Sequence, residues 1–156
     1  MSAVVSPAPF PAPGPGPHPS GGGHPVAPPA RLLVGLAHDL AAASARWEPL
    51  LRFDPERRFS TRLPGPEGVE VWLATWLPGQ SSDLHDHGRT AAALTVVRGA
   101  LLERRSGVAL PGPATLELGP GAVAVLEPGV LHSVANAGDV PAVSIHVRTT
   151  ARAALH

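Results

Sequence analysis

Three histidines have the spacing of a metal site. His85 and His87 are separated by one residue, and His132 follows much later in the chain, just after the turn Pro128-Gly129. Side chains two positions apart on a strand point to the same side, so His85 and His87 can hold one ion. A histidine from a distant strand would complete a facial set and leave positions open for substrate or oxygen. A lone His-x-His pair can equally be a surface accident or a pair of satisfied core residues.

The elements that would position these histidines are short strands. From Phe59 onward, apolar runs alternate with Gly and Pro turns. Such spacing indicates an all-β barrel or sandwich. The predicted strands span residues 59–63, 69–77, 91–97, 100–105, 114–118, 122–126, 131–136 and 142–149. Within 69–77, one face carries Glu70, Trp72, Ala74 and Trp76, as in a wall with one side turned to the interior.

The chain before these strands divides into a tail and a helix. Ten of the 20 prolines and five of the 17 glycines fall within residues 1–30. Residues 1–29 are therefore predicted to be a disordered tail, because proline cannot sustain helix or ladder hydrogen bonds. Apolar residues at steps of three or four predict an amphipathic helix over 30–47, stopped by Pro49. Residues 30–156 are predicted to form one domain that includes this helix.

Composition excludes several functions. The 156-residue chain has no cysteine, which rules out disulfides, zinc-thiolate sites and a cysteine nucleophile. Its 12 basic and 12 acidic residues cancel, so we expect no nucleic-acid partner. Without a signal peptide or a run of about 18 apolar residues, we expect no membrane association and a cytoplasmic location. We also expect a monomer.

The histidines and their surroundings resemble the two signature motifs of the cupin superfamily. The first motif is His85-Asp86-His87 between Gly79 and Gly99, and the second runs from Pro128 through His132 to Asn136. The resemblance implies a single jelly-roll β-barrel. Where the common cupin pattern supplies a ligating glutamate, this chain has Ala91 and Ala92. Three neutral imidazoles would leave the metal its full charge, and such a site favours an anionic substrate such as a thiolate.

A three-histidine set without the acid is similar to the cysteine dioxygenase family. The likeness covers about residues 30–149, with local matches at Trp47-Glu48-Pro49-Leu50, Ser60-Thr61-Arg62, Trp76-Leu77-Pro78-Gly79-Gln80 and Val143-Ser144-Ile145-His146-Val147. The resemblance implies one Fe(II) bound by His85, His87 and His132. It also implies that both atoms of O2 are added to the sulfur of a small thiol, with L-cysteine giving cysteine sulfinate.

The same resemblance assigns roles to further residues. Arg62 matches the arginine that clamps the substrate carboxylate, and a guanidinium suits that role by its planar fork. Pairing with Glu67 or Glu70 at the surface is the alternative. Ser144 and His146 match a Ser-His-Tyr relay near the iron, and a satisfied core pair is the alternative there.

The third member of the relay departs from the family pattern, because Arg148 stands where the family has its tyrosine. The sequence contains no tyrosine at all. Arginine can donate a hydrogen bond, but it is permanently charged and cannot act as a proton acid. Two alternatives therefore stand beside cysteine oxidation. One is a dioxygenase of another small thiol such as 3-mercaptopropionate, and the other is a non-catalytic metal-binding cupin.

Overall fold

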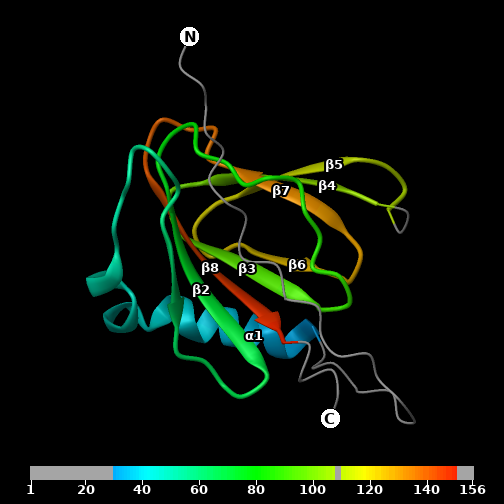
Figure 1. Ribbon diagram of the computed structural model, residues 1–156, viewed down its shortest axis with the longest axis horizontal. Coiled ribbons are helices and arrows are strands. Elements are labelled where there is room, and N and C mark those ends of the chain that lie inside the picture. Colours follow the sequence, from blue (N-terminus) through cyan, green and yellow to red (C-terminus); the bar gives the residue numbers. More distant parts are fainter. Residues whose placement is uncertain (1–29, 108–109, 151–156) are drawn as a thin grey trace.

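The chain folds into two antiparallel β-sheets with a helix on the outer face of the larger one (Figure 1). The computed structural model describes residues 30–107 and 110–150. The predicted tail 1–29 and the end of the predicted domain, 151–156, lie outside the described residues. Within the described part, no helix is both long and apolar enough to cross a membrane.

All eight predicted strands are present, and each boundary falls within one residue of the prediction. They are β1 (Ser60–Leu63), β2 (Val69–Trp76), β3 (Ala92–Arg98), β4 (Leu101–Ser106), β5 (Ala114–Leu118), β6 (Val123–Leu126), β7 (Leu131–Ala135) and β8 (Ala142–Thr149). One sheet has the order β1-β2-β8-β3-β6 and the other the order β5-β4-β7. The predicted jelly-roll class is confirmed, in the form of a two-sheet sandwich.

The predicted helix over 30–47 is too long. Helix α1 spans Ala30–Ala42 and gives way to two 3₁₀ turns, η1 (Ser44–Arg46) and η2 (Glu48–Leu50). Trp47 folds back so that its indole Nε1 donates to the Leu40 carbonyl oxygen at 3.1 Å, an oxygen that also accepts from the Ala43 amide at the end of the helix. Its ring is buried as the periodic pattern required, but it reaches the core by this reversal of the chain rather than along the helix.

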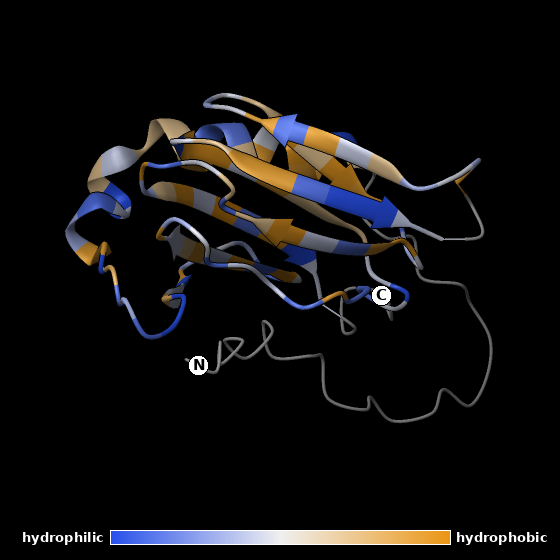
Figure 2. Ribbon diagram, turned by 90° about the horizontal axis from the view of Figure 1, so that it is seen from above, coloured by the Kyte–Doolittle hydropathy of each residue, from blue (hydrophilic) through white to orange (hydrophobic). Residues whose placement is uncertain are grey.

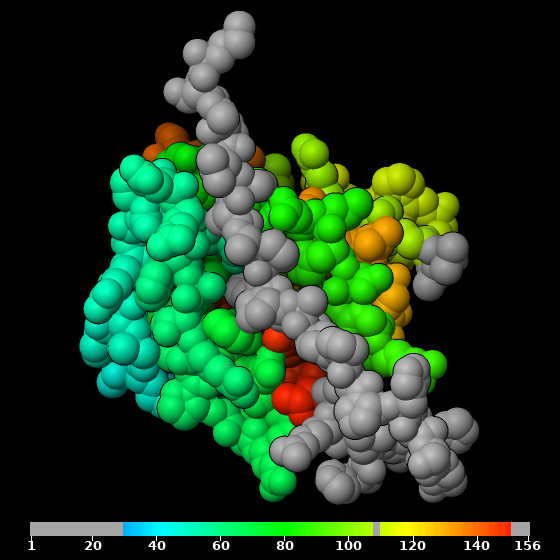
Figure 3. Space-filling model, viewed as in Figure 1, coloured from blue at the N-terminus to red at the C-terminus, as the bar shows by residue number. Residues whose placement is uncertain are grey.

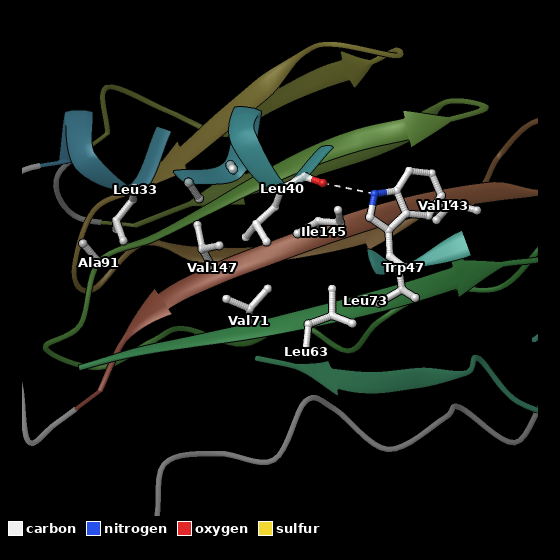
Figure 4. Close-up of a cluster of buried hydrophobic side chains, with 12 residues drawn as sticks. Leu33, Leu40, Trp47, Leu63, Val71, Leu73, Ala91, Val143, Ile145 and Val147 are labelled. Atoms are coloured by element: carbon white, nitrogen blue, oxygen red, sulfur yellow. Dashed lines mark hydrogen bonds between the residues drawn. The ribbon is translucent and has the colours of Figure 1, made fainter. Parts of the chain in front are cut away.

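The helix covers the outer face of the five-stranded sheet. Leu33, Ala37 and Leu40 of α1 are buried against the sheet, whereas Leu32 of the predicted stripe is 56% exposed. Figure 4 shows the cluster beneath the helix. Its sheet residues are Leu63, Val71, Leu73, Ala91, Ala93, Val143, Ile145 and Val147. Side chains alternate between the two faces of a strand. Because one face of β2 and β8 packs into this core, the remaining side chains of these strands point into the space between the two sheets.

The inner face of the large sheet carries the polar residues that the sequence singled out. Apolar and polar residues alternate along the strands (Figure 2). In the antiparallel register of β2 and β8, Ser144 lies opposite Ala74, His146 opposite Trp72, and Arg148 opposite Glu70. The fold thus lines up Ser144, His146 and Arg148 on one face, as the sequence predicted.

Candidate metal centre

The three histidines meet where the segment between β2 and β3 pairs with β7. His85 and His132 exchange backbone hydrogen bonds, with N···O distances of 2.9 and 2.8 Å, and form a single antiparallel bridge. The sequence analysis placed His85 and His87 on a strand, and this detail is wrong because the segment pairs with β7 only at isolated bridges, at Ser81 and His85. A turn follows in which Asp86 Oδ1 accepts from the Gly88 amide and the Thr90 hydroxyl donates to the His87 carbonyl. This turn brings the His87 ring back to its partners.

The imidazole Nε2 atoms converge on one point. His132 Nε2 lies 3.1 Å from His85 Nε2 and 3.1 Å from His87 Nε2. The candidate ligand atoms all lie within 4.8 Å of one another. Two nitrogens that each bind a metal at about 2.1 Å and at a right angle would stand about 3.0 Å apart. These two distances therefore fit His132 at a right angle to each of the other two histidines around a six-coordinate ion.

Hydrogen bonds at the far side of two rings fix their tautomers. His85 Nδ1 lies 2.8 Å from the Asp83 carbonyl oxygen, which can only accept, so Nδ1 carries the proton. His132 Nδ1 likewise faces a carboxylate oxygen of Glu103 at 3.0 Å. In the neutral rings both Nε2 atoms then present lone pairs to each other. A bound cation satisfies such a pair, so the donor set fits a metal ion.

Burial keeps His85 and His87 in the neutral form that a metal requires. Desolvation lowers the pKa of His85 below its usual value, and the positive charge that His132 and Arg58 can carry lowers it further. Desolvation lowers the pKa of His87 to about 3. Both rings are therefore uncharged at neutral pH and can bind a cation without first losing a proton.

Glu103 is a site residue that the sequence analysis missed. Its side chain on β4 is fully buried, and each carboxylate oxygen has a partner: Oε1 faces His132 Nδ1, and Oε2 accepts from Arg105 Nη2 at 3.0 Å. The sequence did hold a signal. Glu103 lies two positions from Leu101 on a predicted strand, so alternation places it on the inward face, where a charged residue needs a partner.

A small pocket adjoins the histidines. It is lined by His87, Trp72, Leu94, His146 and Arg148, together with Ala92, Ala93, Leu126 and Val147. Ala92, which stands where the common cupin pattern has its acid, contributes only a methyl group to this wall. The candidate ligand His87, the predicted relay residue His146 and Arg148 thus line the same pocket.

Ser144 and His146 belong to a buried hydrogen-bonded chain. Trp76 Nε1 donates to Ser144 Oγ at 2.8 Å, and Ser144 Oγ lies 2.8 Å from His146 Nε2. Because the indole N–H can only donate, the serine hydroxyl proton is available to the imidazole. Desolvation, and after it the charge of Arg58, holds the pKa of His146 well below its usual value. His146 is therefore neutral at neutral pH.

Arg62 and Arg148 share one carboxylate. Glu70 Oε2 accepts from Arg148 at 2.7 Å (Nε) and 2.5 Å (Nη2), and Glu70 Oε1 lies 3.8 Å from Arg62 Nη1. The Arg62 side chain is 58% exposed, whereas that of Arg148 is 11% exposed and lines the pocket. The surface pairing of Arg62 with Glu70, one of the two partners considered, is thus observed, and its substrate role stays a prediction. The end of β8, which carries Arg148, is visible at the surface (Figure 3).

Arg58 is the second residue that the sequence analysis missed. Its side chain is only 7% exposed, and its guanidinium carbon lies 4.5 Å from the centre of the Trp76 ring. Burial lowers its pKa to about 10, against the opposing charge of Asp83. Arg58 precedes Ser60 and Arg62 by two and four positions, so extending the period-2 pattern of β1 backward would have pointed to it.

Fold and site together define a cupin with a candidate three-histidine metal centre. A cupin superfamily protein from Desulfitobacterium hafniense superposes with a TM-score of 0.55 at 13% identity, covering 67% of this chain and 88% of its own. The TT1209 protein from Thermus thermophilus is similar at 25% identity, with a TM-score of 0.58 and coverage of 66% and 92%. A double-stranded β-helix protein from Klebsiella pneumoniae matches at 21% identity and a TM-score of 0.57, covering 68% and 88%.

The sequence comparison is more specific than the shared fold. Residues 30–151 match the family described as cysteine dioxygenase type I, which is most of the chain. No match was found among curated proteins. The chain belongs to the cysteine dioxygenase type I family.

Proposed function

We propose that this protein is an Fe(II)-dependent thiol dioxygenase that oxidises L-cysteine to cysteine sulfinate. The reaction adds both atoms of O2 to the thiol sulfur, so that RSH and O2 give RSO2H with no further reductant. The observation that carries the proposal is the convergence of the Nε2 atoms of His85, His87 and His132 in a member of this family.

Membership of the family supports iron as the metal, and the donor set is compatible with it. Three imidazoles with no acid or thiolate among them suit Fe(II), and a facial arrangement leaves positions open for other ligands. Iron would supply the electronic route by which O2, a triplet molecule, reacts with sulfur. The protein's contribution is to orient the substrate and to exclude competing reactions.

The pocket residues would bind and orient the thiol. We propose that the substrate carboxylate is held by one of the two arginines that share Glu70: Arg62, which matches the family's clamp, or Arg148, which lines the pocket. Ser144 and His146 would hold a proton at the pocket wall, since Trp76 orients the serine hydroxyl toward His146 Nε2. Trp72 and Leu94 would exclude water from the thiol.

A specific observation favours the non-catalytic alternative. Arg148 stands in place of the relay tyrosine and is held in an ion pair with Glu70, so the site lacks a neutral phenol donor. A non-catalytic metal-binding cupin is therefore the competing function. The competing substrate is a thiol such as 3-mercaptopropionate, which would need no amine site.

Oxygen consumption distinguishes these functions. Metal-free protein is loaded anaerobically with Fe(II), mixed with L-cysteine, 3-mercaptopropionate or cysteamine, and exposed to O2. Sulfinate is identified by mass spectrometry. Sulfinate from cysteine, absent with His132→Ala, supports the proposal. A faster reaction with 3-mercaptopropionate assigns that substrate instead, and iron binding without oxygen uptake by any thiol would leave the non-catalytic cupin.

A further inference from the structure

The most buried charged side chain near the metal centre is that of Glu103. It lies on β4 beside β7, in a register that places Glu103 opposite Val134 and Arg105 opposite His132. One carboxylate oxygen meets His132 Nδ1 and the other meets Arg105 Nη2, both at 3.0 Å. The carboxylate is thus separated from the converging Nε2 atoms by the width of one imidazole ring.

The carboxylate is held there as an anion. An ion pair between its Oε2 atom and Arg105, together with the hydrogen bond that Oε1 accepts from His132 Nδ1, stabilises the charged form. Burying a charge is costly unless it is paired and hydrogen-bonded, and both oxygens of Glu103 meet that condition. A fixed negative charge therefore lies directly behind one candidate ligand.

This charge changes the electrostatics expected from the sequence. Three neutral imidazoles would leave a divalent ion its full charge of two, whereas a carboxylate hydrogen-bonded to a ligating histidine makes that ring a stronger donor and fixes its orientation. At the place of the usual cupin acid the described structure has only Ala91 and Ala92, both buried and apolar.

We propose that Glu103 supplies, through the His132 ring, the negative charge that a ligating glutamate provides in other cupins, and that it acts as a positioning residue for His132. The inference rests on the proposed metal site. Arg105 holds the second oxygen of Glu103, and its side chain is only 16% exposed. The metal would thus bind three neutral rings, one of which is made a stronger donor by a carboxylate whose charge Arg105 partly offsets.

Metal affinity tests the proposal without any catalytic assay. Co(II) is titrated into metal-free wild type and Glu103→Gln, and binding is followed by the visible absorption of the ion and by competition with a chelator. Glutamine keeps the shape and an oxygen that can accept from His132 Nδ1, but it removes the charge. Affinity is expected to fall about 10- to 100-fold, the usual effect of losing an outer-shell carboxylate. Glu117→Gln, at an exposed position on the neighbouring strand β5, is the matched control and should bind as wild type does.

A second variant separates charge from packing. Arg105→Gln also disturbs the buried pair but keeps the carboxylate, so its Co(II) affinity should remain above that of Glu103→Gln. Thermal unfolding of each metal-free variant shows whether the fold survives. Equal losses in Arg105→Gln and Glu103→Gln, or wild-type affinity and absorption in Glu103→Gln, would overturn the role of Glu103.

The outcomes also separate this inference from the proposed function. The wild-type protein could bind Co(II) in a way that depends on Glu103, while its Fe(II) form oxidises no thiol. That result would contradict the proposed dioxygenase function and support the inference about Glu103. If the wild-type protein oxidises a thiol, and Glu103→Gln changes neither this activity nor the metal affinity, the proposed function is supported and the inference about Glu103 is contradicted. A wild-type protein that binds no metal would remove both.

Discussion

Arg148 and Glu70 are locked together across the β2–β8 pair. They are opposite each other in the register, and Glu70 Oε2 accepts from Arg148 at 2.7 Å (Nε) and 2.5 Å (Nη2). Partial burial would raise the Glu70 pKa, but the hydrogen bond and charge of Arg148, a hydrogen bond from Trp72 and the charge of Arg62 lower it. Arg148, which the sequence analysis matched to the family's tyrosine, is thus a cation held by the carboxylate of Glu70.

Replacing Arg148 with tyrosine is expected to raise turnover. The permanent charge of arginine prevents it from acting as a proton acid, whereas a phenol at the same pocket wall is a neutral donor. The rate of sulfinate formation from cysteine should therefore increase in Arg148→Tyr, and the wild-type rate should lie below about 1 per second, the low end for ordinary enzymes. Arg104→Tyr, at an exposed position on β4, is the control.

The opposite result would give Arg148 a different role. A wild-type protein that turns over cysteine at an ordinary rate and is slowed by Arg148→Tyr uses the Arg148–Glu70 pair as a working part of the site. The Arg148–Glu70 pair would then perform the function that the tyrosine has in the family, and the absence of tyrosine would not be a defect of the site.

Two thiols test whether Arg62 holds the substrate carboxylate. Arg62→Ala should weaken cysteine binding by about 1.5 kcal/mol, the low end for a hydrogen bond to a charged group, because the side chain is largely exposed. Cysteamine, which has no carboxylate, should bind Arg62→Ala and wild type equally. Binding is measured from the spectral change of the ferrous nitrosyl form. If Arg148→Gln weakens cysteine binding and Arg62→Ala does not, Arg148 rather than Arg62 binds the substrate carboxylate.

Iron content tests the ligand set itself. Wild type is expected to hold about one iron per chain, and His132→Ala should hold none, because two remaining ligands leave an incomplete site. His38→Ala changes an exposed histidine of α1 and serves as the control. Stoichiometric iron in purified His132→Ala, measured by atomic emission, would contradict the assignment of His132.

The sequence predicted what depends on local periodicity and on histidine spacing. Turn residues and alternation placed all eight strands, and spacing placed His85, His87 and His132 together. It could not predict the end of α1, because the Trp47 indole bond to Leu40 depends on a chain reversal. Local patterns also do not identify a buried charge's partner, which is why Glu103 was missed.

The exposure of Arg62 is a further property that the sequence could not predict. Its place in a family motif predicted a pocket residue, but exposure depends on how β1, at the edge of the sheet, packs against its neighbours. Arg148 reached the pocket because β8 lies in the middle of the sheet, between β2 and β3. The position of a strand within the sheet, which periodicity does not give, decided which arginine is enclosed.

The stability of the metal-free protein is expected to fall as the pH drops below about 6.5. Burial lowers the folded-state pKa of His87 to about 3 and that of His146 well below its usual value, whereas both titrate near 6.5 in the unfolded chain. Between these values the unfolded chain binds more protons than the folded one, so the free energy of unfolding rises with pH and is lost on acidification. For His87 the slope can reach about 1.4 kcal/mol per pH unit.

Urea unfolding of metal-free protein at pH 7.5, 6.5, 5.5 and 4.5 measures this slope. His87→Gln cannot be protonated and should show a shallower decline, while the exposed His38→Ala should decline as wild type does. The lowered pKa values of Glu70 and Glu103 add a further loss only below about 4.5, where the unfolded carboxylates become protonated. A free energy of unfolding that is flat from pH 7.5 to 5.5 would mean that the histidines are not held neutral in the folded state, and the electrostatic basis for a ready metal site would fail.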